Sequence, residues 1–149
     1  MPPTMQDVRR WLDPEEVDYA GAKAALGPGA FPHLLALVQG PDAALAAKAA
    51  YLAGLISGEG SEPVVRAAAQ SSTPAVRVAA ASTARYLPER GATALLDLLE
   101  RDSDVGVRKV LVKSASVLRT PTILNRVRGI VERDPDEVIR RLRGHVERP

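Results

Sequence analysis

The sequence contains no cysteine, and only 3% of its 149 residues are aromatic. Without cysteine the chain can form no disulfide framework, no thiolate zinc site and no cysteine nucleophile, which fits a reducing compartment. One Phe, one Trp and three Tyr are too few to build an aromatic core. We therefore expect a cytoplasmic protein whose core consists of small aliphatic side chains.

Long hydrophobic runs are also missing. No stretch approaches the roughly 18 to 20 apolar residues that a membrane span needs, and MPPTMQDVRRWLDPEE lacks the apolar region of a signal peptide. The net charge is only +2, with 46% hydrophobic and 26% charged residues, so the chain is too apolar to be disordered. We expect one domain, residues 1–149, with no membrane partner.

The positive features begin with an internal repeat. Three segments align at intervals of about 31 residues, which places Leu45, Val76 and Val107 in one column. A fourth segment from Arg133 continues the pattern with one residue of slip. Within the segments, apolar residues recur at intervals of three and four, which is typical of amphipathic helices. Each unit is predicted to contain a helix of about ten residues, a polar turn and a helix of about fifteen.

Polar residues mark the predicted helix starts. Asp42, Thr73 and Asp104 stand where the longer helices begin, so their side chains can accept a hydrogen bond from a free backbone N–H. Near the N-terminus, Asp13 and Glu16 have the spacing of a capping box. These positions predict a further helix pair upstream, with its second helix starting at Asp13.

The best copies of the repeat are Val76-Arg77-Ala80-Ala84-Leu87 and Val107-Arg108-Leu111-Ala115-Leu118. This pattern resembles the HEAT repeat family. The resemblance implies an all-α, right-handed α-α superhelix (a HEAT-like solenoid, similar to armadillo proteins) of about ten helices in five pairs. It also implies that Arg77 and Arg108 reach an acid or carbonyl of an adjacent unit. The expected parts are an N-terminal capping pair at 1–28 and repeat units at 29–58, 61–88, 91–119 and 121–147.

In such a superhelix the second helices line the concave face. We expect this face to make the chain a protein-interaction module or scaffold that binds an acidic segment of a protein partner. The alternative is that each residue on it is a solvated position of an amphipathic helix. Tyr86 is a further aromatic candidate or a core residue. The expected partner-binding residues are Tyr19, Lys23, Lys48, Tyr51, Arg77, Arg85, Lys109 and Lys113.

Nucleic-acid binding is the alternative. Residues 100–149 hold twelve basic and eight acidic side chains, against eight and ten in residues 1–99. Such arginines could contact phosphates, but interleaved acids and scarce aromatic residues argue against it. The candidate contacts are Arg126, Arg128, Arg140, Arg141 and Arg143.

No catalytic constellation is visible. His33 and His145 are each isolated, so no metal triad can be assembled. The glycines at 27–29 and 58–60 follow predicted helices and lack the strand and lysine of a phosphate loop. We expect no enzyme activity, no metal and no cofactor. Because HEAT-like lyases exist, a non-catalytic or accessory subunit of a lyase-type enzyme stays open as a third hypothesis.

Overall fold

The structure is a computed structural model that describes residues 1–147, and this part of the chain is all-helical, without a strand. The α-helices are α1 (Met5–Leu12), α2 (Tyr19–Leu26), α3 (Phe31–Val38), α4 (Ala43–Ile56), α5 (Ser61–Ala69), α6 (Pro74–Ser82), α7 (Glu89–Leu99), α8 (Val105–Ser116), α9 (Pro121–Arg133), α10 (Glu137–Arg140) and α11 (Arg143–Glu147). Two 3₁₀ turns, η1 (Gly27–Ala30) and η2 (Ala84–Tyr86), lie between them.

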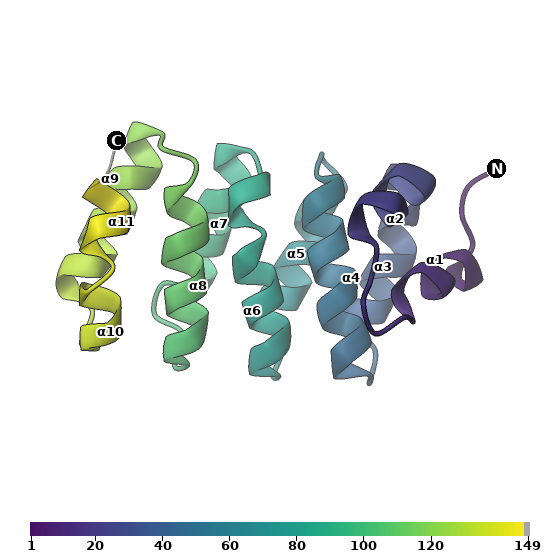
Figure 1. Cartoon of the computed structure of the whole chain (residues 1–149), viewed down its shortest axis with the longest axis horizontal. Coiled ribbons are helices and arrows are strands. Elements are labelled where there is room, and N and C mark those ends of the chain that lie inside the picture. Colours follow the sequence, from purple (N-terminus) through teal and green to yellow (C-terminus); the bar gives the residue numbers. More distant parts are fainter. Residues whose placement is uncertain (148–149) are drawn as a thin grey trace.

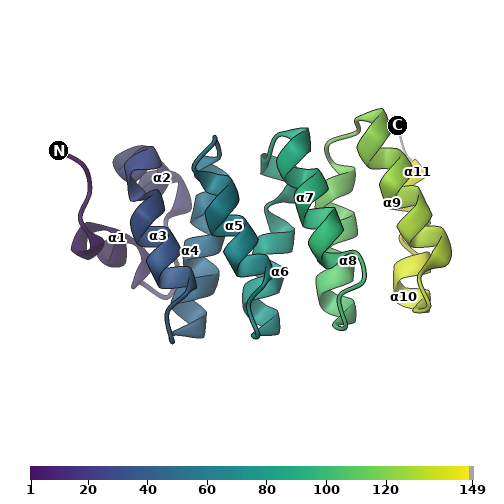
Figure 2. The ribbon, with the colours of Figure 1, turned by 180° about the vertical axis from the view of Figure 1, so that it is seen from behind.

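The helices form two rows. Figure 1 shows α4, α6 and α8 side by side in the front row, and Figure 2 shows α3, α5, α7 and α9 in the row behind them. Neighbours within the front row pack on one another, and α3, α5 and α7 each pack on the helix that follows them in the chain. The two ends of the chain lie at opposite ends of the rows (Figure 1).

The capping predictions are confirmed at two of the repeat positions. The Asp42 carboxylate accepts a hydrogen bond from the Leu45 N–H at 3.0 Å, and the Asp104 carboxylate accepts from the Gly106 and Val107 N–H groups at 2.7 and 3.2 Å. Thr73 occupies the equivalent position before α6, but its side chain makes no capping bond.

The predicted start of α2 is wrong. Asp13 ends α1, because its N–H donates to the Arg9 carbonyl at 2.8 Å. Asp18 caps α2 in its place, and its carboxylate accepts from the Gly21 N–H at 2.9 Å. Residues 13–18 therefore form an acidic loop between α1 and α2, and the second helix begins only at Tyr19.

The core is aliphatic, as predicted. Leu34, Leu52, Leu96 and Leu111 are completely buried among alanines and valines, and Phe31 is the one aromatic residue buried among those described. Small groups let the helices approach closely. At Gly54 in α4, an added Cβ would collide with the side chain of Thr83, which follows α6.

The helix count differs from the prediction of about ten. Nine helices in residues 1–147 have eight or more residues, because the last predicted helix is divided into the short helices α10 and α11. Gly144 in this segment lowers its helix propensity. The predicted long helix of the middle unit also stops early, and α6 gives way to η2 after nine residues. No helix within 1–147 has the length and apolarity to cross a bilayer.

Candidate protein-interaction face

Two arginine–aspartate pairs connect successive front-row helices and the turns beside them. Arg77 donates from Nε and Nη2 to the Asp102 carboxylate at 2.8 and 3.2 Å, and Arg108 donates to Asp134 at 2.9 and 3.2 Å. Each guanidinium also donates to a carbonyl six residues earlier, Arg77 to Ser71 at 3.0 Å and Arg108 to Asp102 at 2.6 Å. This is the type of contact that the HEAT resemblance implies for these arginines.

Because Arg77 is bound to Asp102, its guanidinium is not free to contact a partner, unlike in the prediction. The Arg77 side chain is only 14% exposed. In the second pair, the hydrogen bonds to Asp134 raise the pKa of the Arg108 guanidinium. We had not identified Asp134. The signal that could have found it is the Asp-x-Asp spacing before α8 and α10, in which the carboxylate of the first aspartate also accepts a hydrogen bond from the N–H of the second aspartate. Each pair therefore holds a front-row helix to the turn that precedes the next helix of the row.

All three tyrosines of the chain meet on the front row. Tyr19 begins α2, Tyr51 lies in α4 and Tyr86 lies in η2. The Tyr19 and Tyr51 rings pack edge to face with their centroids 4.7 Å apart, and Tyr51 and Tyr86 do so at 6.2 Å. The structure therefore brings together residues more than thirty positions apart in the sequence, and it places Tyr86 on the surface, where its residue is 38% exposed.

The backbone around Tyr86 is held from both sides. The Ser57 hydroxyl donates to the Tyr86 carbonyl at 3.2 Å, from a residue whose φ of 58° lies in the left-handed region. On the other side, the Ser114 hydroxyl accepts from the Arg85 N–H at 3.0 Å and donates to the Ser82 carbonyl at 2.8 Å. Ser114 thus stabilises the break between α6 and η2 that turns Tyr86 outward.

Burial and hydrogen bonding also change the acidity of the cluster. The Tyr51 hydroxyl lies 3.4 Å from the Tyr86 hydroxyl. This hydrogen bond, followed by burial, raises the pKa of Tyr51 to about 12. Burial alone raises the pKa of Tyr19. Tyr19 and Tyr51 are therefore neutral at physiological pH and can be buried without the cost of desolvating a charge.

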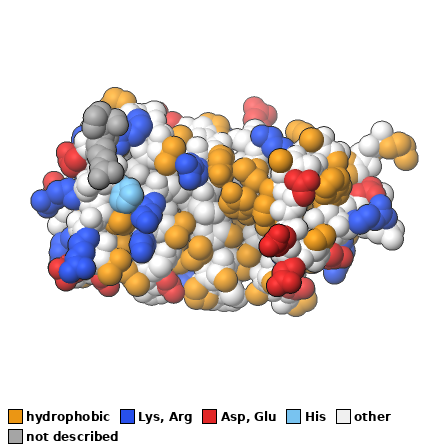
Figure 3. All heavy atoms as spheres, viewed as in Figure 1, with side chains coloured by type: hydrophobic (Ala, Val, Ile, Leu, Met, Phe, Trp, Pro, Cys, Tyr) orange, Lys and Arg blue, Asp and Glu red, His pale blue; other side chains and the backbone are white. Residues whose placement is uncertain are grey.

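Two neighbouring front-row helices present almost no charge to solvent. The sequences of α4 and α6 contain only Lys48 and Arg77 as charged residues. Lys48 is also used internally, because its ammonium donates to the Leu12 and Pro14 carbonyls at 3.0 Å each. Hydrophobic side chains gather on this side of the molecule in Figure 3. We call this surface the tyrosine face and define it by Tyr19, Tyr51, Val78, Ala79, Ser82 and Tyr86, which are half-buried or exposed.

The remaining predicted residues of the face are exposed bases. Lys109 and Lys113 lie one turn apart on α8, and Lys23 lies in the last turn of α2. The Arg85 guanidinium lies over the Tyr86 ring, 5.7 Å from its centroid, which is a cation–π distance. Of the eight predicted residues, Tyr19 and Tyr51 belong to the tyrosine face and four bases are exposed, while Lys48 and Arg77 bind other parts of the chain.

The C-terminal arginines are largely paired with acids. Arg128 pairs with Glu147 at 3.5 Å and Arg141 with Glu137 at 3.0 Å. Arg140 is exposed and donates to the Asp134 carbonyl at 2.9 Å, and Arg143 is exposed at the start of α11. These contacts do not assemble the five predicted nucleic-acid residues into one basic surface.

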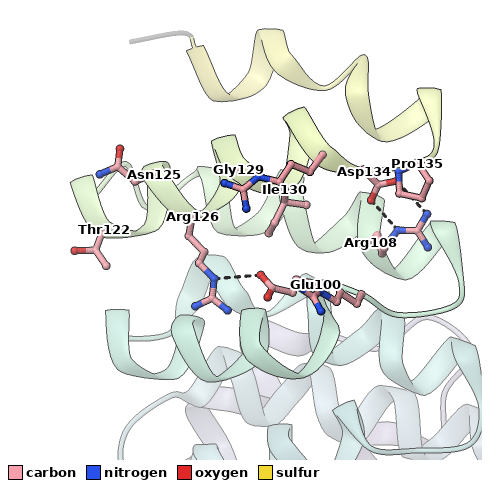
Figure 4. A pocket seen from close by; sticks show the side chains of 11 residues that line it. Glu100, Arg108, Thr122, Asn125, Arg126, Gly129, Ile130, Asp134 and Pro135 are labelled. Atoms are coloured by element: carbon pink, nitrogen blue, oxygen red, sulfur yellow. Dashed lines mark hydrogen bonds and ion pairs between the residues drawn. The ribbon is translucent and has the colours of Figure 1, made fainter.

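A cavity of about 750 Å³ lies between α7 and α9 in the other row (Figure 4). Arg126 enters it, but its guanidinium is bound by Glu100 at 3.1 Å and Asp97 at 2.6 Å, and these hydrogen bonds raise its pKa. Arg108 and Asp134 close the far end of the cavity with their own ion pair (Figure 4). Paired acids thus offset these two guanidinium charges.

Comparisons with protein-family models, with curated proteins and with solved structures find no match to this chain. Among residues 1–147, no group of three or more His, Cys, Asp or Glu side chains is arranged to hold a metal ion.

Proposed function

We propose that this chain is a HEAT-like α-solenoid that binds a protein partner through the tyrosine face. The repeat period, the stacked helix pairs and the two matching arginine–aspartate pairs support the HEAT-like assignment. The cytoplasm remains the proposed compartment, on the strength of the cysteine-free composition.

The observation that carries the proposal is the uncharged outer side of α4 and α6. A helix that is apolar all round is normally buried, whereas a surface helix carries charge on its solvent side. Here Val78, Ala79 and Tyr51 are only half-buried, and the two charged residues of these helices are engaged in internal bonds. An apolar surface of this kind on a soluble protein marks an interaction site.

The three tyrosines supply the anchors for a partner. Tyr is enriched among interface residues whose truncation costs most binding energy, because its ring buries a large area while its hydroxyl keeps a hydrogen bond. The exposed Arg85, Lys109 and Lys113 stand beside the cluster. Charges at the edge of an interface mainly orient the partner and raise the association rate.

A capture experiment tests the face itself. Tagged wild-type protein, an Ala79→Glu variant and a Gln70→Glu control are incubated with cytosolic extract, and bound proteins are identified by mass spectrometry. Ala79 lies on α6 in the tyrosine face, whereas Gln70 is an exposed residue at the end of α5, and both substitutions add one negative charge. Circular dichroism establishes that the three proteins have the same helical content.

We expect a specific protein that wild type and the control recover equally and that Ala79→Glu recovers roughly ten-fold less, as for loss of one central contact. Equal recovery of every bound protein by the three baits would overturn the proposal. A Tyr86→Ala variant gives a second reading from an exposed position.

A further inference from the structure

The two sides of the tyrosine face carry opposite charge. On one side, the loop 13–18 contains Asp13, Glu15, Glu16 and Asp18, all exposed, for a formal charge of −4. Lys48 attaches this loop to α4 through the Pro14 carbonyl. Lys23 of α2 lies in the same half, and together with the Lys48 ammonium it reduces the formal charge of this group to −2 (−4 + 2).

The other side is basic. Arg85, Lys109 and Lys113 are exposed and sum to +3, and α8 contains no acidic residue. In Figure 3, red side chains lie beside the hydrophobic groups at the centre on their N-terminal side and blue ones on their C-terminal side, and both ends of the molecule carry charges of either sign. The two charged sides are separated by α4 and α6, whose charged side chains Lys48 and Arg77 bind other parts of the chain, since the front row runs α4, α6, α8 from the acidic loop onward.

This order of acidic, apolar and basic regions is self-complementary. In a two-fold dimer the same patch serves both subunits, so the patch must fit a reversed copy of itself. An axis that crosses the row between α4 and α6 would place tyrosines against tyrosines and the acidic loop of each copy against α8 of the other. We propose that the partner of the tyrosine face is a second copy of this chain, docked face to face and reversed end to end.

The proposed interface would take a small share of the molecular surface. A standard interface buries about 800 Å² on each partner. The described part of the chain exposes 7886 Å², so such an interface takes about a tenth of the surface. The contact between the acidic loop of one copy and α8 of the other occurs twice by symmetry. This favours the reversed arrangement over the parallel one, in which like charges would meet.

This inference rests on the proposed function, and complementary charge reversals test it. The purified full chain is studied by sedimentation equilibrium over a wide concentration series. The loop variant carries Glu15→Lys and Glu16→Lys, and the α8 variant carries Lys109→Glu and Lys113→Glu. Arg101→Glu with Arg133→Glu makes the same charge change as the α8 variant beside the cavity between α7 and α9, and serves as its matched control.

We expect wild type and the control to form a dimer with the same Kd. Each of the two face variants alone should dimerise at least about ten-fold more weakly, because the loop variant cancels the formal charge of the loop (−4 + 4 = 0) and the α8 variant makes the basic side negative (+3 − 4 = −1). An equimolar mixture of the two variants should recover the dimer, since the substituted side chains then have opposite signs in both contacts, and a chain with all four substitutions should recover it too. Added salt should weaken the wild-type dimer, because these charges are exposed.

Two results would overturn the inference: a wild-type chain that stays monomeric at every concentration, or a mixture no tighter than its components. Neither result refutes the tyrosine face as a docking site for another protein, because the capture experiment decides that question separately. Equal capture by wild type and Ala79→Glu would count against the face, whatever the oligomeric state.

Discussion

Removal of Asp134 should be among the most destabilising substitutions in this protein. The Asp134 side chain is 3% exposed and that of Arg108 is 11% exposed, so water cannot replace the contacts of either group. Asp134→Ala leaves the Arg108 guanidinium with only the Asp102 carbonyl. Breaking one side of a buried ion pair costs about 3–5 kcal/mol. That is a large part of the about 5–15 kcal/mol by which a domain is stable.

A matched surface pair gives the comparison. Arg141 and Glu137 are 73% and 64% exposed and 3.0 Å apart, so their separation is close to that of the buried pair. Because solvent screens exposed charges, Glu137→Ala should change the free energy of unfolding by less than about 1 kcal/mol. Both variants are measured by urea unfolding followed by circular dichroism, with the slope of the transition checked for a change in the unfolding unit.

A double variant separates two contributions to the free energy of unfolding: the loss of the ion-pair attraction and the cost of leaving one buried charge without a partner. Arg108→Met with Asp134→Ala leaves no buried charge without a partner, and the Met side chain retains much of the volume of the arginine stem. We expect the double variant to cost at least about 1 kcal/mol less than the sum of the single substitutions. Additivity within about 0.5 kcal/mol, or an Asp134→Ala cost as small as that of Glu137→Ala, would refute the reasoning.

Two further predictions concern packing and pH. Gly54→Ala should destabilise the protein by about 1–3 kcal/mol, because the new methyl group collides with Thr83. Gly129→Ala in the open middle of α9 should stabilise it by up to about 1 kcal/mol. Thermal unfolding shows whether each variant is less or more stable than wild type. The raised pKa of Tyr51 contributes stability that is complete below pH 10 and is lost as the pH rises towards about 12. In an ultraviolet titration, Tyr86→Phe should lower the Tyr51 pKa towards 10, and an unchanged titration would contradict the hydrogen bond as its main cause.

Local sequence was enough to predict the helical class and most of the helix starts. Apolar spacing of three and four residues forces a helix to bury one side, and Asp42 and Asp104 satisfy N–H groups within their own first turn. One error occurred where a residue could serve two neighbouring elements. Asp13 could begin a helix or end one, and its N–H contact with Arg9 decides for the end of α1.

The position of the tyrosine face could be predicted from the sequence in outline, but the contacts of its neighbouring side chains could not. Periodicity places Tyr19, Tyr51 and the α8 lysines on the outer sides of their helices, because that depends only on position within a turn. It could not show that Lys48 reaches back to the loop 13–18, since its carbonyl partners are more than thirty residues away in the sequence. A long flexible side chain has no preferred partner until the helices are packed.

The sequence by itself determined the helices, their repeat period and the aliphatic composition of the core, because these depend on residue types at short range. Only the tertiary structure decided which charged side chains are bound by other parts of the chain and which point into solvent. Arg77 pairs with Asp102, 25 residues away in the sequence, so a guanidinium that the sequence predicts on the outer surface is bound internally. The same packing brings three tyrosines together from three units, since contacts between stacked helices depend on their distance and angle, which no single helix specifies.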